Sequence, residues 1–145
     1  MRFRVALAAL LLAAPALVLQ VQAAPLAFEA ELDPVPFDAT NRADVINSIG
    51  NATATLDGST LSVKGSFSNL TSPATAWSFR IGLAKGVPGD AIGTLTVAHA
   101  RAGDFSGAVK LTAKQAAALK AQALYIRIDS EKAPDGNLQG WLEAK

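Results

Sequence analysis

The sequence predicts an all-β fold, an antiparallel two-sheet β-sandwich of about eight short strands with one short helix before the last two strands. Three observations support this prediction. Apolar and polar residues alternate over short segments, turn residues separate those segments, and one stretch has the capping and composition of a helix. The length of 145 residues allows one domain and hardly more.

The first 23 residues are typical of a secretory signal peptide. Two arginines precede an apolar run from Val5 to Leu19, and the small residues Val21 and Ala23 precede a cleavage site. The apolar run is short for a bilayer crossing. We therefore expect residues 1–23 to be removed, with no membrane span left afterwards. Residues 24–145 are then expected to form a single domain in the periplasm or outside the cell.

Composition excludes several classes of function. Loss of Arg2 and Arg4 would lower the basic count from 13 to 11 against 12 acidic residues, which gives a net charge of −1. Such a chain lacks the basic field of a nucleic-acid-binding protein. The absence of cysteine and the presence of one histidine exclude thiol catalysis, cysteine zinc sites and any site that needs two imidazoles.

The predicted strands share an alternation of apolar and polar residues, and most are bounded by Gly, Pro, Asn or Asp. They cover residues 26–32, 50–56, 60–67, 77–83, 91–98, 105–111, 124–129 and 137–143. The stretch 38–48 is mostly polar and predicts an ordered surface loop. Asp57-Gly58 lies between the second and third strands and predicts a type I′ hairpin turn, in which both central residues have positive φ.

One segment predicts a helix of two to three turns. Thr112 and Gln115 have the spacing of a capping box, in which the threonine side chain bonds a backbone amide and the glutamine reaches back. The following residues 116–121 are mostly strong helix formers.

The order of these motifs resembles the CHRD domain, the module found in chordin and in many bacterial exported proteins. The segment FSNLTSP at residues 67–73 is similar to the "gL-T-S-P" stretch of the family. The most specific similarity is at the end, where YIRIDS at residues 125–130 leads to APDGNLQGWL at residues 133–142. The resemblance covers nearly all of the chain after residue 25, and it implies the fold more strongly than any chemistry.

The chain departs from the family at its histidines. Ser78 and Arg80 stand where the family usually has an "H-I-H" pair, Asp129 replaces a third histidine, and Asn137 replaces a glutamate. Any metal binding by those histidines is therefore not expected here. If the two histidine-bearing strands are neighbours, we expect Arg80 and Asp129 to form an exposed ion pair. In both strands, the polar residues are expected to point away from the core.

Two candidate sites are weighed against simpler interpretations. Glu29 and Glu31 share one face of a strand about 7 Å apart. Paired carboxylates at such separations occur in glycosidases, but a solvated outer face has the same pattern and is the favoured interpretation. His99 is predicted to lie partly exposed near the end of a strand, without the Gly-x-Ser-x-Gly motif of a serine hydrolase.

A second set of candidates lies near the C-terminus. Asp129, Glu131 and Asp135 offer oxygen ligands for calcium, although a strand end followed by a Pro-Asp-Gly turn explains them without metal. Trp77 is in phase with apolar neighbours and is predicted to be in the core. Trp141 is in phase with polar residues, and whether it is exposed for binding stays open.

The favoured hypothesis is an exported, non-enzymatic structural or binding module with an unknown protein or envelope partner and no cofactor or catalytic residue. The alternative is a periplasmic metal- or ligand-binding protein that uses the region from Asp129 to Asp135. A hydrolase that uses Glu29 and Glu31 is the third hypothesis.

Overall fold

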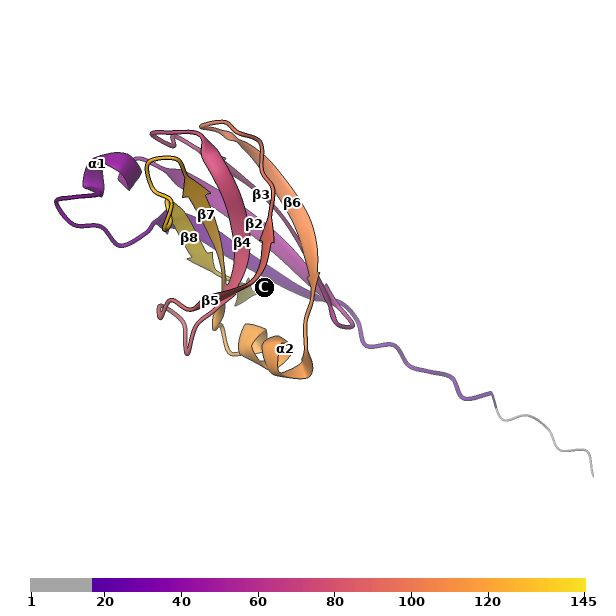
Figure 1. Cartoon of the computed structure of the whole chain (residues 1–145). Coiled ribbons are helices and arrows are strands. Elements are labelled where there is room, and N and C mark those ends of the chain that lie inside the picture. Colours follow the sequence, from indigo (N-terminus) through magenta and orange to yellow (C-terminus); the bar gives the residue numbers. More distant parts are fainter. Residues whose placement is uncertain (1–16) are drawn as a thin grey trace, which may run out of the picture.

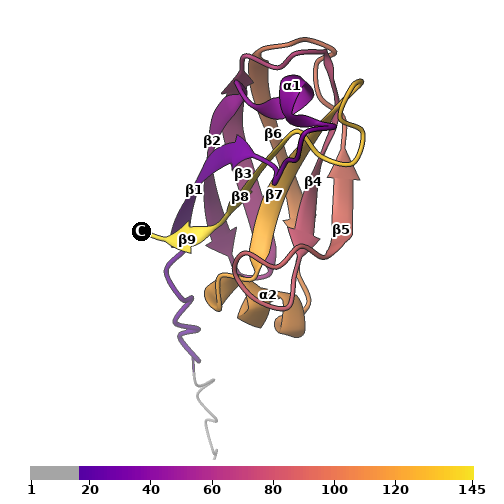
Figure 2. The ribbon, with the colours of Figure 1, turned by 90° about the vertical axis from the view of Figure 1, so that its left-hand side faces the viewer.

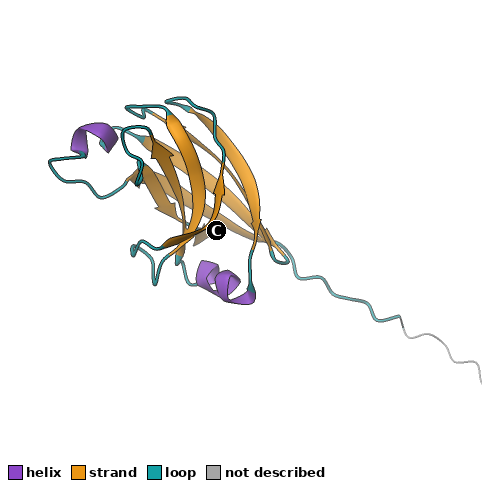
Figure 3. Cartoon of the chain, in the orientation of Figure 1, coloured by secondary structure: helices purple, strands orange, loops and turns teal. Residues whose placement is uncertain are grey.

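The computed structural model describes residues 17–145, which contain nine strands and two helices (Figure 3). The predicted leader therefore lies largely outside the described residues. The strands are β1 (Leu26–Pro34), β2 (Ile49–Asp57), β3 (Thr60–Ser68), β4 (Ala74–Ile81), β5 (Asp90–Leu95), β6 (Gly103–Lys110), β7 (Leu124–Ser130), β8 (Leu138–Trp141) and β9 (Glu143–Ala144). The helices are α1 (Arg42–Val45) and α2 (Ala113–Lys120).

The strands form one antiparallel sheet that nearly closes into a barrel, in the order β5-β4-β7-β8-β1-β2-β3-β6 (Figures 1 and 2). The prediction of an all-β antiparallel fold with a short helix before the last strands is confirmed, but the strands form one nearly closed sheet rather than a clear two-sheet sandwich. The reason lies in β1, which pairs with β2 along its length and with β8 through Asp33 and Pro34. This strand joins the two groups of strands that a sandwich would keep apart.

The two end strands, β5 and β6, meet through side chains. A Cβ atom added to Gly107 of β6 would lie 2.4 Å from Leu95 Cδ2 of β5 and 2.8 Å from Trp77 Cζ2. A Cβ atom added to Gly93 of β5 would lie 3.5 Å from Val109 Cγ2 of β6. Gly107 therefore lets the two edges approach each other closely at the seam, whereas a Cβ atom at Gly93 would make an ordinary contact.

Large apolar side chains fill the barrel. Trp77 is fully buried, as predicted, and its ring lies 4.8 Å from Phe79 and 5.0 Å from Phe105 in tilted pairs. Such tilted aromatic contacts at about 5 Å between ring centroids are favourable. Apolar residues of all the long strands complete this core.

The helices lie at opposite ends of the barrel (Figure 2). Helix α2 has the predicted capping box, because Gln115 N donates to Thr112 Oγ1 at 3.2 Å and Thr112 N donates to Gln115 Oε1 at 2.9 Å. Helix α1 is one short turn within the stretch 38–48 that the sequence predicted as a loop. It buries Val45 against Val35 and Ala133.

The hairpin of β2 and β3 is confirmed, but its turn differs from the prediction. Asp57 pairs with Thr60, so Gly58 and Ser59 are the two central residues. Gly58 has a φ of 59°, whereas Ser59 is not among the residues with positive φ. A positive φ at the first central residue only is the pattern of a type II′ turn.

Residues 17–25 have no regular secondary structure and lead away from the barrel (Figure 1). Within residues 17–145, no helix is long and apolar enough to cross a membrane.

Candidate functional site

The outer face of β1 carries three carboxylates in a row. Glu29, Glu31 and Asp33 are exposed, while the intervening residues of β1 point into the core. This alternation places both predicted carboxylates, Glu29 and Glu31, on the solvent face of the barrel. Asp33 extends the row by one position, because β1 continues to Pro34 rather than ending before it.

Along one edge, β1 pairs with β8 and β9, and this pairing brings its carboxylates next to residues of those strands. Glu29 pairs with Glu143, and Asp33 pairs with Gln139. Trp141, the last residue of β8, lines the same groove as Glu31.

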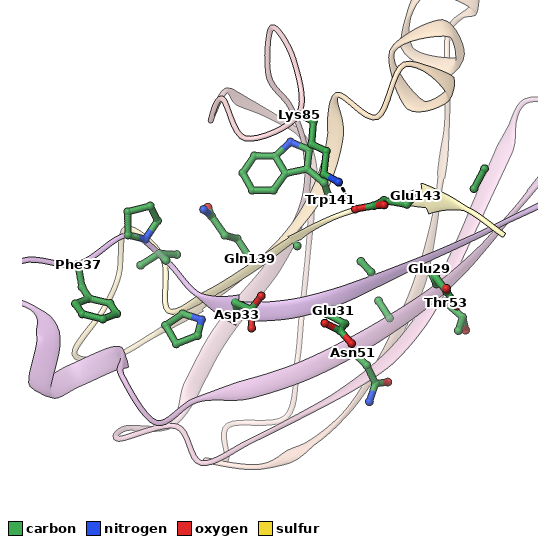
Figure 4. A pocket seen from close by; sticks show the side chains of 17 residues that line it. Glu29, Glu31, Asp33, Phe37, Asn51, Thr53, Lys85, Gln139, Trp141 and Glu143 are labelled. Atoms are coloured by element: carbon green, nitrogen blue, oxygen red, sulfur yellow. Dashed lines mark hydrogen bonds and ion pairs between the residues drawn. The ribbon is translucent and has the colours of Figure 1, made fainter.

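These strands line a groove with a volume of about 830 Å³ (Figure 4). The three carboxylates and Gln139 lie along its length, and Trp141 and Lys85 lie on the side nearest the loop between β4 and β5. Phe37, from the segment after β1, lies at one end. The groove therefore combines acidic, amide and aromatic groups on one face of the molecule.

Two exposed ion pairs occupy part of this acidic face. Lys85 Nζ contacts Glu143 Oε1, and Lys145 Nζ lies 3.1 Å from Glu29 Oε2. Glu31 and Asp33 have no ion-pair partner within 4 Å among residues 17–145. The groove thus keeps an excess of negative charge in its middle.

The Trp141 side chain, which forms one wall of the groove, is held in place by Tyr125. Its indole ring stacks on Tyr125, with 4.7 Å between centroids and 24° between planes. The Tyr125 hydroxyl accepts from Gly89 N at 3.0 Å and from Arg80 Nε at 3.2 Å, which ties the loop after β4 to β7. Trp141 is partly buried rather than freely exposed, and this answers the question that the sequence left open.

The positions that replace the family's histidines lie on paired strands, but they do not form the predicted contact. Arg80 faces Tyr125 across β4 and β7 and donates to Gly89 O at 3.0 Å. Asp129 instead pairs with Arg127, whose Nε lies 2.8 Å from Asp129 Oδ1. The predicted ion pair between Arg80 and Asp129 is therefore wrong, because a nearer arginine on the same face takes the carboxylate.

The outer face of these strands is also less exposed than predicted. Ser78 and Tyr125 are 2% and 1% exposed, and the side chain of Asp129 is 15% exposed. Burial raises the pKa of the Asp129 carboxyl, although the hydrogen bond from Arg127 opposes this shift. Trp141 and the loop after β4 provide part of this cover.

The three calcium candidates do not form a cluster. Asp129 is held by Arg127, Glu131 Oε1 lies 2.7 Å from His99 Nε2, and Asp135 is exposed. In residues 17–145, no group of three histidine, aspartate or glutamate side chains is placed to hold a metal ion. His99 is exposed, and it lies in the loop after β5 rather than at a strand end, because β5 ends at Leu95.

The comparison with known families matches the CHRD domain to residues 24–142. The chain belongs to the CHRD domain family. This confirms the resemblance seen in the sequence and places strands β1 to β8 inside the family domain, whereas β9 follows it. No curated protein and no solved structure matches the chain.

Some residues of the groove could not be predicted from the sequence. Phe37 and Lys85 come from loops, and Glu143 belongs to a two-residue strand. The alternation in residues 26–32 and the polar phase of Trp141 were visible, but only the register between β1 and β8 brings them together.

Proposed function

We propose that this CHRD-domain protein is an exported, non-enzymatic binding module whose ligand lies in the groove over β1 and β8. The observation that carries the proposal is a groove of about 830 Å³ that combines a partly exposed indole with unpaired carboxylates. Binding sites are typically concave and combine aromatic surface with a few directed polar groups.

Binding is favoured over hydrolysis by the use of the carboxylates. Glu29 is engaged by Lys145, and its side chain is 60% exposed. A hydrolytic pair needs one carboxyl in surroundings that keep it protonated, and Glu29 and Glu31 both lie on the open face of β1. A hydrolase thus remains the second candidate only through the spacing of this pair.

Groove-dependent capture tests the proposal. The exported protein and its Trp141→Ala variant are immobilised and exposed to envelope extract from the native cell, with Glu131→Gln as a control outside the groove. We expect a component retained by the wild type and Glu131→Gln but lost from Trp141→Ala. Equal retention by all three would place binding elsewhere, and turnover lost in Glu29→Gln would favour the hydrolase.

Export is tested separately by mass spectrometry of the exported protein. We expect Ala24 as its first residue, because Val21 and Ala23 provide the small residues before the cleaved bond. Exported protein that still begins at Met1 would contradict the proposed processing.

A further inference from the structure

The three carboxylates of β1 repeat at every second residue of an extended strand. With a rise of about 3.4 Å per residue, Glu29, Glu31 and Asp33 are spaced at about 7 Å. Alternate side chains of any extended peptide have the same spacing. An extended chain that lies along β1 can therefore place one side chain at each carboxylate without a change of register.

The excess of negative charge in the groove favours a ligand with positively charged groups. Glu29 and Glu143 are directly opposite each other on paired strands, and like charges in such a position are unfavourable. The lysines that offset this repulsion are about half exposed, so their ion pairs are weak and exchangeable. Glu31 and Asp33 have no ion-pair partner among residues 17–145.

Trp141 adds an aromatic surface to this acidic groove. Its indole lines the same groove as Glu31, on the side of Lys85, and Tyr125 holds the ring by stacking at 4.7 Å. A groove that holds both an aromatic face and carboxylates suits ammonium or guanidinium groups, which gain cation–π contacts at the ring and charge-assisted contacts at the carboxylates. At the end of the groove, Arg42 lies 5.7 Å from the centre of the Phe37 ring. Arg42 is a positively charged residue of this chain, and the acidic part of the groove ends near it.

From this arrangement, we propose that the groove binds an extended peptide segment with lysine or arginine at alternate positions. The inference rests on the proposed function of the groove and adds the class of its ligand. The peptide is recognised through its side chains, because the edges of β1 already pair with β2, β8 and β9.

Two peptides of identical composition test the spacing. One has the sequence Lys-Thr-Lys-Thr-Lys and the other Lys-Lys-Lys-Thr-Thr, both with blocked ends. Their binding to the purified exported protein is measured by calorimetry at low and at physiological salt. We expect the alternating peptide to bind about threefold or more tightly than the block peptide, with affinity that falls as salt rises.

Matched variants test the residues. Glu31→Gln should weaken the alternating peptide by about threefold or more, whereas Glu131→Gln, which removes a carboxylate outside the groove, should leave its affinity unchanged. Equal affinity for the two peptides, or equal loss in the two variants, would overturn the proposal, because binding would then depend on total charge alone.

The outcome also separates this inference from the proposed function. If neither peptide binds but a component of the envelope is still captured through Trp141, the peptide proposal fails and the groove remains a binding site. If neither peptide binds and no capture depends on Trp141, both proposals fail.

Discussion

Gly140 is the residue at which the structure predicts the sharpest effect of a small substitution. It lies in β8, where this strand passes β1, and a Cβ atom there would lie 2.1 Å from the carbonyl oxygen of Glu31 and 2.8 Å from Leu32 Cδ2. Close contacts between carbon and oxygen are normally about 3.3 Å or longer. Gly140→Ala must therefore push β1 and β8 apart by about 1 Å.

The expected loss of unfolding free energy depends on which atoms the new Cβ atom meets. Overpacking of a dense interior costs about 1–3 kcal/mol, and the upper part of this range applies because backbone rather than a flexible side chain must move. Replacing glycine by alanine also lowers the conformational entropy of the unfolded chain, and this offsets about 0.4–1 kcal/mol of the cost. The net loss should be about 2 kcal/mol, or a decrease in Tm of about 8 °C for a domain of this size.

Urea denaturation of the purified protein measures this loss, and Gly93→Ala is its control. Gly93 also lies in a strand, but its Cβ atom would meet its nearest neighbour at 3.5 Å, an ordinary contact distance. We expect Gly93→Ala to match or slightly exceed the wild type, and Gly140→Ala to unfold at clearly lower urea. If the two variants unfold together, the close approach of β1 and β8 is refuted, and with it the floor of the groove.

Three further predictions concern single residues. Gly58→Val should lower the unfolding free energy by about 1–3 kcal/mol, since φ is 59° there, and wild-type denaturation would contradict the turn. Tyr125→Phe should cost about 1–2 kcal/mol and speed hydrogen exchange of the Gly89 amide, which loses its acceptor at 3.0 Å; unchanged exchange would mean that the hydroxyl does not hold the loop. Burial raises the pKa of Asp129, so its contribution to stability falls as pH rises from the unfolded value of about 3.9 through the higher folded value. Asp129→Asn should remove this falling component from unfolding free energies measured against pH, and a wild-type-minus-variant difference that stays flat or rises would contradict it.

The local elements could be predicted because their signals lie within a few residues. The capping box of α2 needs only Thr112 and Gln115, and the hairpin of β2 and β3 needs only alternation around Gly58. The turn was misplaced by one position, because β2 extends one residue further into the connection than the apolar pattern indicates. A polar residue such as Asp57 can end a strand without belonging to the turn.

The closure of the sheet and the groove could not be predicted, because both depend on pairing between distant segments. Alternation in β1 shows which side chains face solvent, but it does not tell which strand lies on either side. The pairing of Asp33 with Gln139 spans most of the chain. Once that pairing is known, the carboxylates of β1 and the side chain of Trp141 can be recognised as the two walls of one groove.

The residues at the family's histidine positions distinguish two sides of the outer face of the barrel, one over β4 and β7 and one over β1. Ser78 and Arg80 on β4 lie beside β7, which carries Asp129, so the three positions belong to one pair of strands. A guanidinium has only donors and no lone pair for a metal, and here Arg80 bonds Tyr125 and Gly89 instead. These bonds fasten the loop after β4 and, through Tyr125, the ring of Trp141. The β4–β7 side is therefore held in place, and the neighbouring side, with the unpaired carboxylates of β1, is where we propose that the ligand binds.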